Sequence, residues 1–149
     1  VLNALQYQYP YIFAEKKYPG APQVNIHIIN TEEFKIGKLN IIPVRVMHYR
    51  LPVLGFRIGD LAYITDANYI SEEEKEKLYG VKYLIINALR REQHVSHFTL
   101  AEALELISEI SPKRAYLTHI SHLMGRQQQL DKELPNSVVA AYDGLSFEI

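Results

Sequence analysis

The segment Ala115-Tyr116-Leu117-Thr118-His119-Ile120-Ser121-His122 joins an apolar run to a polar end. The apolar half is typical of a buried strand. The polar half carries two of the six histidines of the chain. Open α/β folds bind ligands at the carboxyl ends of their strands, so we expect these imidazoles to lie at such an edge. Two histidines alone are weak evidence, and a functional interpretation needs partners from elsewhere in the chain.

Possible partners follow other strands of the predicted sheet. His48, Asp66 and His119 each end an apolar strand, and a fourth strand leads into a loop that carries His94 and His97. Neutral imidazole and carboxylate ligands suit zinc, manganese or iron. Any one of these residues alone is more often solvated than ligating. Their joint position at consecutive strand ends indicates a metal site.

The pattern predicts an α/β (α+β) fold, a mixed sheet with helices packed on it. Capping boxes at Ser71 and Thr99 predict two helix starts, and Gly59-Asp60 predicts a hairpin. The alternation at 24–29 predicts a half-buried strand with His27 on its solvated face. The expected helices are 1–7, 71–79, 99–111 and 123–134, and the expected strands are 24–29, 34–36, 39–48, 53–58, 61–66, 81–87 and 115–118, with a closing hairpin of 138–142 and 145–149.

The composition is that of an ordinary globular domain. The chain has 149 residues, 48% of them hydrophobic, and its formal net charge is −1, so no footprint for nucleic acid is visible and we expect no nucleic-acid partner. It has no cysteine, which excludes disulfides and thiolate metal sites and fits a reducing, cytoplasmic location. No apolar run approaches membrane-spanning length, so we expect no membrane partner.

The strand ends resemble motifs of a known family. The segment of His48 before Leu51-Pro52-Val53-Leu54-Gly55, the run Ala62-Tyr63-Ile64-Thr65-Asp66 and the run Leu117-Thr118-His119-Ile120-Ser121-His122 resemble the third, fourth and fifth metal motifs of the metallo-β-lactamase superfamily. The similarity extends to Ala141-Tyr142-Asp143-Gly144-Leu145 and is strongest to the branch of the phosphoribosyl cyclic phosphodiesterase of phosphonate catabolism.

The resemblance implies a role for each residue. His48 and His119 would each ligate one of two divalent metal ions, Zn or Mn, and Asp66 would bridge them. His97 would contact the phosphate or protonate the leaving oxygen. His122 would contact the substrate or support a ligand, whereas His94 has no clear counterpart. The implied function is a metal-dependent hydrolase, a phosphodiesterase acting on a small phosphorylated substrate such as a phosphodiester or cyclic phosphate.

One family motif is absent. The superfamily pattern His-x-His-x-Asp-His, which supplies four ligands, does not occur in the sequence. We therefore expect residues 1–149 to form a single unit, the C-terminal half of an αββα sandwich with helices on one face of its sheet. Such a fragment would be inactive alone, with the metals absent or partial, and homo-oligomeric or domain-swapped, because half a sandwich leaves apolar sheet surface uncovered.

Two further interpretations stay open at this point. The chain could be a non-catalytic binding or assembly module built on half the sandwich. It could also be an RNase Z-like nuclease, although that activity calls for a tRNA-binding arm and a basic surface, and the sequence has neither.

Overall fold

A single mixed sheet organises the chain. A computed structural model describes residues 1–149. The sheet has eight strands in the order β1-β2-β3-β4-β6-β7-β8, with β5 paired to β2. The strands are β1 (Phe34–Ile36), β2 (Leu39–His48), β3 (Leu51–Ile58), β4 (Leu61–Ile64), β5 (Tyr69–Ile70), β6 (Tyr83–Asn87), β7 (Arg114–Thr118) and β8 (Val138–Ala140). The mixed α/β fold expected from the sequence is confirmed.

The sheet has an antiparallel half and a parallel half. Strands β1 to β4 form an antiparallel meander, and the β3–β4 hairpin turns at Gly59-Asp60, as predicted. Strands β4, β6, β7 and β8 are parallel to one another. The carboxyl ends of these parallel strands therefore meet at one edge, where the loops after β4, β6 and β7 lie together.

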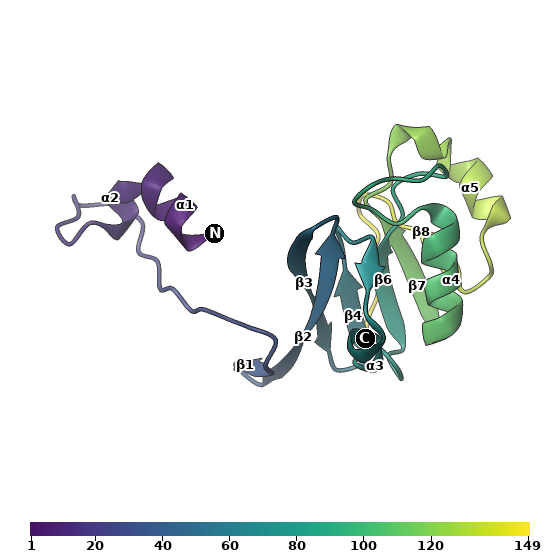
Figure 1. Cartoon of the computed structure of the whole chain (residues 1–149), viewed down its shortest axis with the longest axis horizontal. Helices are drawn as coiled ribbons and strands as arrows, with labels where there is room; N and C mark the ends of the chain where they lie inside the picture. Colours follow the sequence, from purple (N-terminus) through teal and green to yellow (C-terminus); the bar gives the residue numbers. More distant parts are fainter.

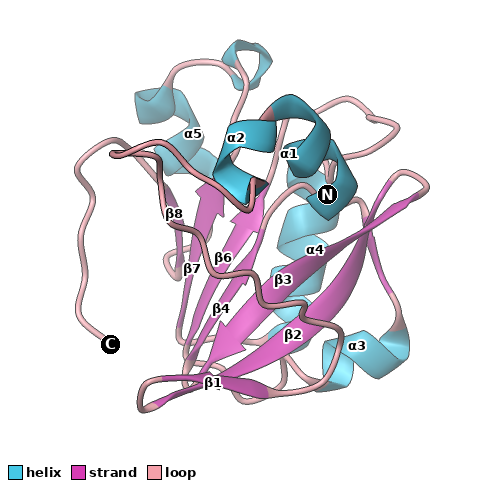
Figure 2. Cartoon of the chain, turned by 90° about the vertical axis from the view of Figure 1, so that its left-hand side faces the viewer, coloured by secondary structure: helices cyan, strands magenta, loops and turns pink.

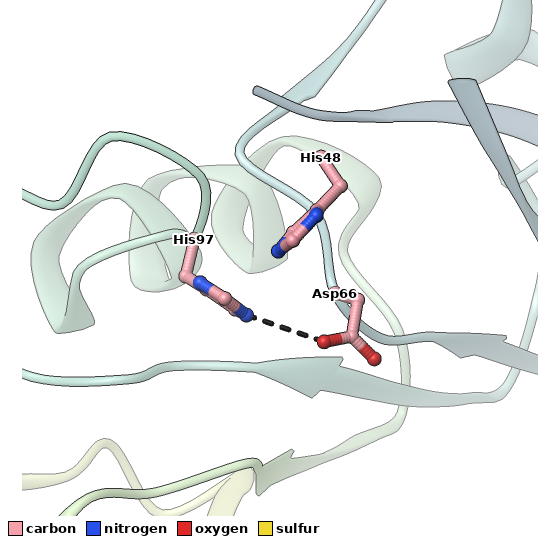
Figure 3. A group of neighbouring side chains, drawn as sticks. All are labelled: His48, Asp66 and His97. Carbon is pink, nitrogen blue, oxygen red and sulfur yellow. Dashed lines mark hydrogen bonds and ion pairs between the residues drawn. The ribbon is translucent and has the colours of Figure 1, made fainter. Parts of the chain in front are cut away.

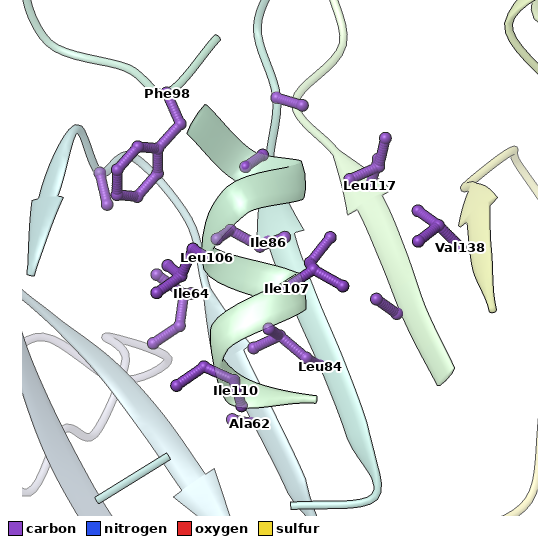
Figure 4. Packing of buried hydrophobic residues seen from close by; sticks show 14 of the residues in the cluster. Ala62, Ile64, Leu84, Ile86, Phe98, Leu106, Ile107, Ile110, Leu117 and Val138 are labelled. Carbon is purple, nitrogen blue, oxygen red and sulfur yellow. The ribbon is translucent and has the colours of Figure 1, made fainter. Parts of the chain in front are cut away.

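Three helices flank one face of the sheet. They are α3 (Glu72–Glu76), α4 (Leu100–Ile110) and α5 (Gln127–Glu133), and a 3₁₀ turn, η1 (His122–Met124), precedes α5. The apolar stripe of α4, made by Leu106, Ile107 and Ile110, packs on the inward side chains of β4 and β6 (Figure 4). This contact forms the core of the molecule.

The N-terminal segment lies apart from this core. The helices α1 (Leu2–Gln8) and α2 (Pro10–Phe13) bury no residue and stand off the sheet on the side opposite α4 (Figure 1). The segment after α2 then crosses in front of the sheet before it enters β1 (Figure 2). None of the helices combines the length and apolarity needed to cross a membrane.

Three local predictions are wrong. Residues 24–29 form no strand, although His27 is solvent-exposed as expected. The predicted helix 123–134 is interrupted at Gly125, whose φ of 96° no helix contains. The closing hairpin is also absent, because β8 pairs in parallel with β7 and the last residues form no strand; instead the Phe147 ring stacks 4.4 Å from that of Tyr116.

Candidate metal centre

Four predicted site residues converge at one edge of the sheet. His48 ends β2, Asp66 follows β4, His97 lies in the loop after β6 and His119 follows β7. Ligand atoms of His48, Asp66 and His97 all lie within 4.8 Å of one another (Figure 3). His119 approaches from the next strand, with its Nε2 atom 3.7 Å from Asp66 Oδ1. The carboxylate of Asp66 therefore has imidazoles from three different segments around it.

His48 provides the test of whether this cluster fits a metal. Its Nε2 atom is buried and has no hydrogen-bond partner. The ring of His48 packs edge-on against that of His97, with centroids 4.7 Å apart. Buried polar atoms in native proteins nearly always have partners, so an unpartnered imidazole nitrogen facing a carboxylate and a second imidazole indicates a place for a cation. The donor set of nitrogen and carboxylate oxygen fits zinc, manganese or iron.

Asn87 holds the Asp66 loop in place. Its side chain is fully buried at the end of β6, where Oδ1 accepts a hydrogen bond from the Ala67 N–H and Nδ2 donates one to the Ala67 carbonyl, both at 2.9 Å. The same carbonyl accepts a 2.8 Å bond from the N–H of Phe98, next to His97. The loops that carry Asp66 and His97 are thus tied to each other independently of any bound metal.

His97 is the most enclosed histidine of the cluster. Its side chain is only 10% exposed, and its Nε2 lies 3.2 Å from Asp66 Oδ1. Burial lowers the pKa of His97; the hydrogen bond to Asp66 raises it, and the neighbouring imidazoles of His119, His48 and His94 lower it further. The net effect favours a neutral ring, which is the form that binds metals.

A second set of contacts lies behind His97. The Nδ1 atom of His97 is 2.9 Å from Ser96 Oγ and 3.2 Å from Nδ1 of His94. The N–H of Ser96 in turn donates to His94 Nδ1 at 3.3 Å. These contacts fix the rotation of the His97 ring and so direct its other nitrogen toward Asp66.

The structure gathers some predicted residues and leaves one outside. His48, Asp66, His97 and His119 come together, whereas His122 is exposed in η1 and forms no side-chain hydrogen bond to the cluster. The role of His122 stays a prediction. Sequence reasoning assigned no role to His94, Ser96 or Asn87. Asn87 could have been identified from the sequence, because it is a polar residue at the end of an apolar strand.

The family of the chain follows from comparison with known proteins. A model of the beta-lactamase superfamily domain matches residues 1–120. The chain belongs to the metallo-β-lactamase superfamily. This confirms the family resemblance drawn from the strand ends.

The chain is similar to three longer proteins. A crystal structure of a diphosphatase from the PhnP family is 31% identical, with a TM-score of 0.86, and the match covers 97% of this chain and 53% of that one. The metallo-β-lactamase fold protein YhfI from Bacillus subtilis is 20% identical, with a TM-score of 0.72, over 96% of this chain and 61% of that one. An octanoyltransferase of Porphyromonas gingivalis is 36% identical over 147 residues, which are 97% of this chain and 30% of that protein. The chain thus spans less than two thirds of each.

Proposed function

We propose that the protein is a metal-dependent hydrolase of phosphate esters, acting on a phosphodiester, a cyclic phosphate or a diphosphate. The proposal depends chiefly on the buried, unpartnered Nε2 of His48 within the cluster of His48, Asp66 and His97. The 31% identity to a PhnP-family diphosphatase supports phosphate chemistry over the other ester and amide hydrolyses that such a fold can carry.

The residues then take distinct roles. His48 and His119 would each hold a zinc or manganese ion, and Asp66 would bridge the two ions. Bound divalent cations polarise a phosphoryl oxygen and lower the pKa of water. His97 keeps a nitrogen beside Asp66, 3.2 Å from its Oδ1, where a neutral ring can orient a phosphate oxygen by a hydrogen bond. His122, exposed at the same end of the sheet, would contact the substrate.

The cluster leaves room for ligands from outside this chain. Three or four protein ligands are few for two tightly bound ions, since affinity requires a filled and oriented ligand set. We therefore propose that residues 1–149 act as the C-terminal part of a larger sandwich. In keeping with this, the chain covers only 53% of the diphosphatase. The substrate would be a small phosphorylated molecule.

Acyl transfer is not carried over from the octanoyltransferase. The chain matches only 30% of that protein. A non-catalytic module and an RNase Z-like nuclease each predict a different result when metal binding and hydrolysis are measured together.

Metal titration of the purified, chelator-treated protein tests the proposal. Isothermal calorimetry with Zn²⁺ or Mn²⁺ should detect binding, and His48→Ala or Asp66→Asn should each weaken it by at least about tenfold, because ligands and their supports carry that much affinity. His27→Ala is the matched control, since His27 is exposed and lines a different cavity, which none of the cluster residues lines. The rate of hydrolysis of bis(4-nitrophenyl) phosphate should likewise fall in His48→Ala and Asp66→Asn and stay unchanged in His27→Ala.

Three outcomes would count against the proposal. Equal metal affinity in wild type, His48→Ala and His27→Ala would remove the metal site. Metal binding without any phosphoesterase activity in the protein together with its remaining sandwich would favour the non-catalytic module. Cleavage of tRNA precursors but not of small phosphodiesters would favour the nuclease.

A further inference from the structure

A shallow, open cavity of about 480 Å³ lies beside the cluster of His48, Asp66 and His97. It is lined by His48, Tyr49, Arg50, Leu51, Val95 and Ser96. Two of these residues connect it with the cluster, because His48 belongs to the cluster and Ser96 contacts His97 through a 2.9 Å hydrogen bond. A phosphate held by the cluster would therefore direct one of its substituents into this cavity.

Tyr49 is held in the cavity wall in a strained conformation. Its φ is 58°, in the left-handed region that bulky residues seldom adopt. Asn68, two residues after Asp66, stabilises it: Asn68 Oδ1 accepts a 2.7 Å bond from the Tyr49 N–H, and the Asn68 N–H donates to the Met47 carbonyl at 2.8 Å. Tyr49 and Arg50 form the two-residue turn between the paired residues His48 and Leu51, and such hairpin turns require positive φ. The turn therefore presents both side chains at the end of the sheet where the cluster lies. Tyr49 is 51% exposed, so its side chain does not fill a core.

Arg50 adds an available positive charge. Its guanidinium lies 5.1 Å from the centroid of the Tyr49 ring, and it forms no ion pair with a carboxylate of the chain. A guanidinium can stack by its face while its edge donates hydrogen bonds to phosphate. Leu51 and Val95, each 61% exposed, give the same cavity an apolar border.

We propose that this cavity is a nucleotide subsite. A nucleobase would stack on the Tyr49–Arg50 pair between Leu51 and Val95, and the Arg50 guanidinium would bind an oxygen of the phosphate that joins the nucleotide to the scissile bond. The substrate is then a phosphodiester or diphosphate with a nucleotide as one half. This inference rests on the proposed function, because the cluster must hold the adjoining phosphate.

Adenosine 5′-monophosphate and ribose 5-phosphate test the base site, since ribose 5-phosphate has the same phosphorylated sugar with a hydroxyl in place of the base. Calorimetry on the purified protein should give adenosine 5′-monophosphate an affinity about tenfold or more above that of ribose 5-phosphate, the range that stacking on an aromatic ring provides. Tyr49→Leu should abolish this difference without changing the affinity for ribose 5-phosphate. Tyr49→Phe should keep the difference in affinity, and Arg50→Gln should lower the affinity for both probes.

Matched controls separate the subsite from general effects. Tyr18→Leu alters an exposed tyrosine in the N-terminal segment, and Arg114→Gln alters an arginine at the opposite, amino end of β7. Both variants should bind the probes like wild type. A pentaadenylate RNA should bind no more tightly than the mononucleotide, given the net charge of −1; tighter binding of the RNA would overturn the assignment to a free nucleotide.

Equal affinity for the two probes in wild type would overturn the subsite, as would an equal loss for both in Tyr49→Leu. The Zn²⁺ titration separates this result from failure of the proposed function. If Zn²⁺ binds through His48 and the base preference is absent, only the subsite fails. If no Zn²⁺ binds, the proposed function fails, and the subsite falls with it because it requires the adjoining phosphate to be held.

Discussion

Asp66 and His119 reach the site through an unusual backbone conformation. Their φ angles are 53° and 55°, and each such residue costs about 1–3 kcal/mol unless the surroundings compensate. Four non-glycine residues have positive φ, and three of them, Tyr49, Asp66 and His119, lie at this edge of the sheet. The fourth, Ser111, ends α4 in the conformation usual for a helix terminus. Strain is therefore concentrated where the chain presents its candidate ligands.

His97 should make the stability of the metal-free protein depend on pH. Burial lowers the pKa of His97 in the folded state below its usual value of 6.5. Well above pH 6.5 the ring is neutral in both the folded and unfolded states. As the pH falls through 6.5, the unfolded chain takes up the proton first and the free energy of unfolding decreases. In His97→Gln this decrease should be smaller.

Urea denaturation of the chelator-treated protein at a series of pH values between about 5 and 8 checks this prediction. His27→Gln is the control, because this histidine is exposed and should leave the pH profile of wild type unchanged. A profile for His97→Gln that matches wild type would show that the buried ring carries no such linkage.

At the scale of the elements, the sequence predicted the strands that carry the candidate ligands. Apolar runs that end in His48, Asp66 and His119 were sufficient, because strand periodicity and a polar end are local properties. The family resemblance added His97. The contacts of His94 and Ser96 behind His97 were not accessible, because they depend on the path of an irregular loop.

The failed strand predictions have a common physical cause. The alternation at 24–29 is genuine, but a strand also needs an edge to pair with, and that segment instead crosses the face of the sheet. The final residues likewise place Phe147 against Tyr116 on a face rather than in the ladder. Gly55 in β3 shows that local patterns also miss contacts between strands. A Cβ atom at this position would come within 2.9 Å of the Tyr63 carbonyl oxygen, and no local pattern reveals this constraint.

The capping box of α4 gives a prediction at the scale of the helix. Thr99 Oγ1 accepts a 3.2 Å bond from the Glu102 N–H, and Glu102 Oε2 accepts a 2.8 Å bond from the Thr99 N–H. Thr99→Ala should lower the free energy of unfolding by about 1 kcal/mol, whereas Thr99→Ser should retain most of the stability that the cap provides. Thr31→Ala, at an exposed position outside any element, should have no effect in the same urea denaturation. Equal stability of the two Thr99 variants would mean that the cap is not what supports this helix.

At the scale of the whole molecule, the sheet is apolar on both faces. One face packs on α4, and the other presents Ile41, Phe56, Ile58, Leu61 and Tyr63 around a cavity of about 1120 Å³ that only the crossing segment partly covers. A sheet with two apolar faces is typical of a strand layer between two other layers. We propose that the further half of the sandwich supplies this second layer.

Without that layer, residues 1–149 should self-associate through this face, because exposed apolar patches of such extent drive association. Light scattering coupled to size exclusion should give a mass above the 17.2 kDa of one chain, rising with concentration. Tyr63→Lys, at a 43% exposed position in the centre of the face, should shift the protein toward monomer by placing a charge where the second copy packs. Leu123→Lys, similarly exposed but in η1 on the edge of the molecule, should leave the mass unchanged. A monomer at every concentration in wild type would mean that the crossing segment and Phe147 cover this face well enough, and that the second layer is not required for solubility.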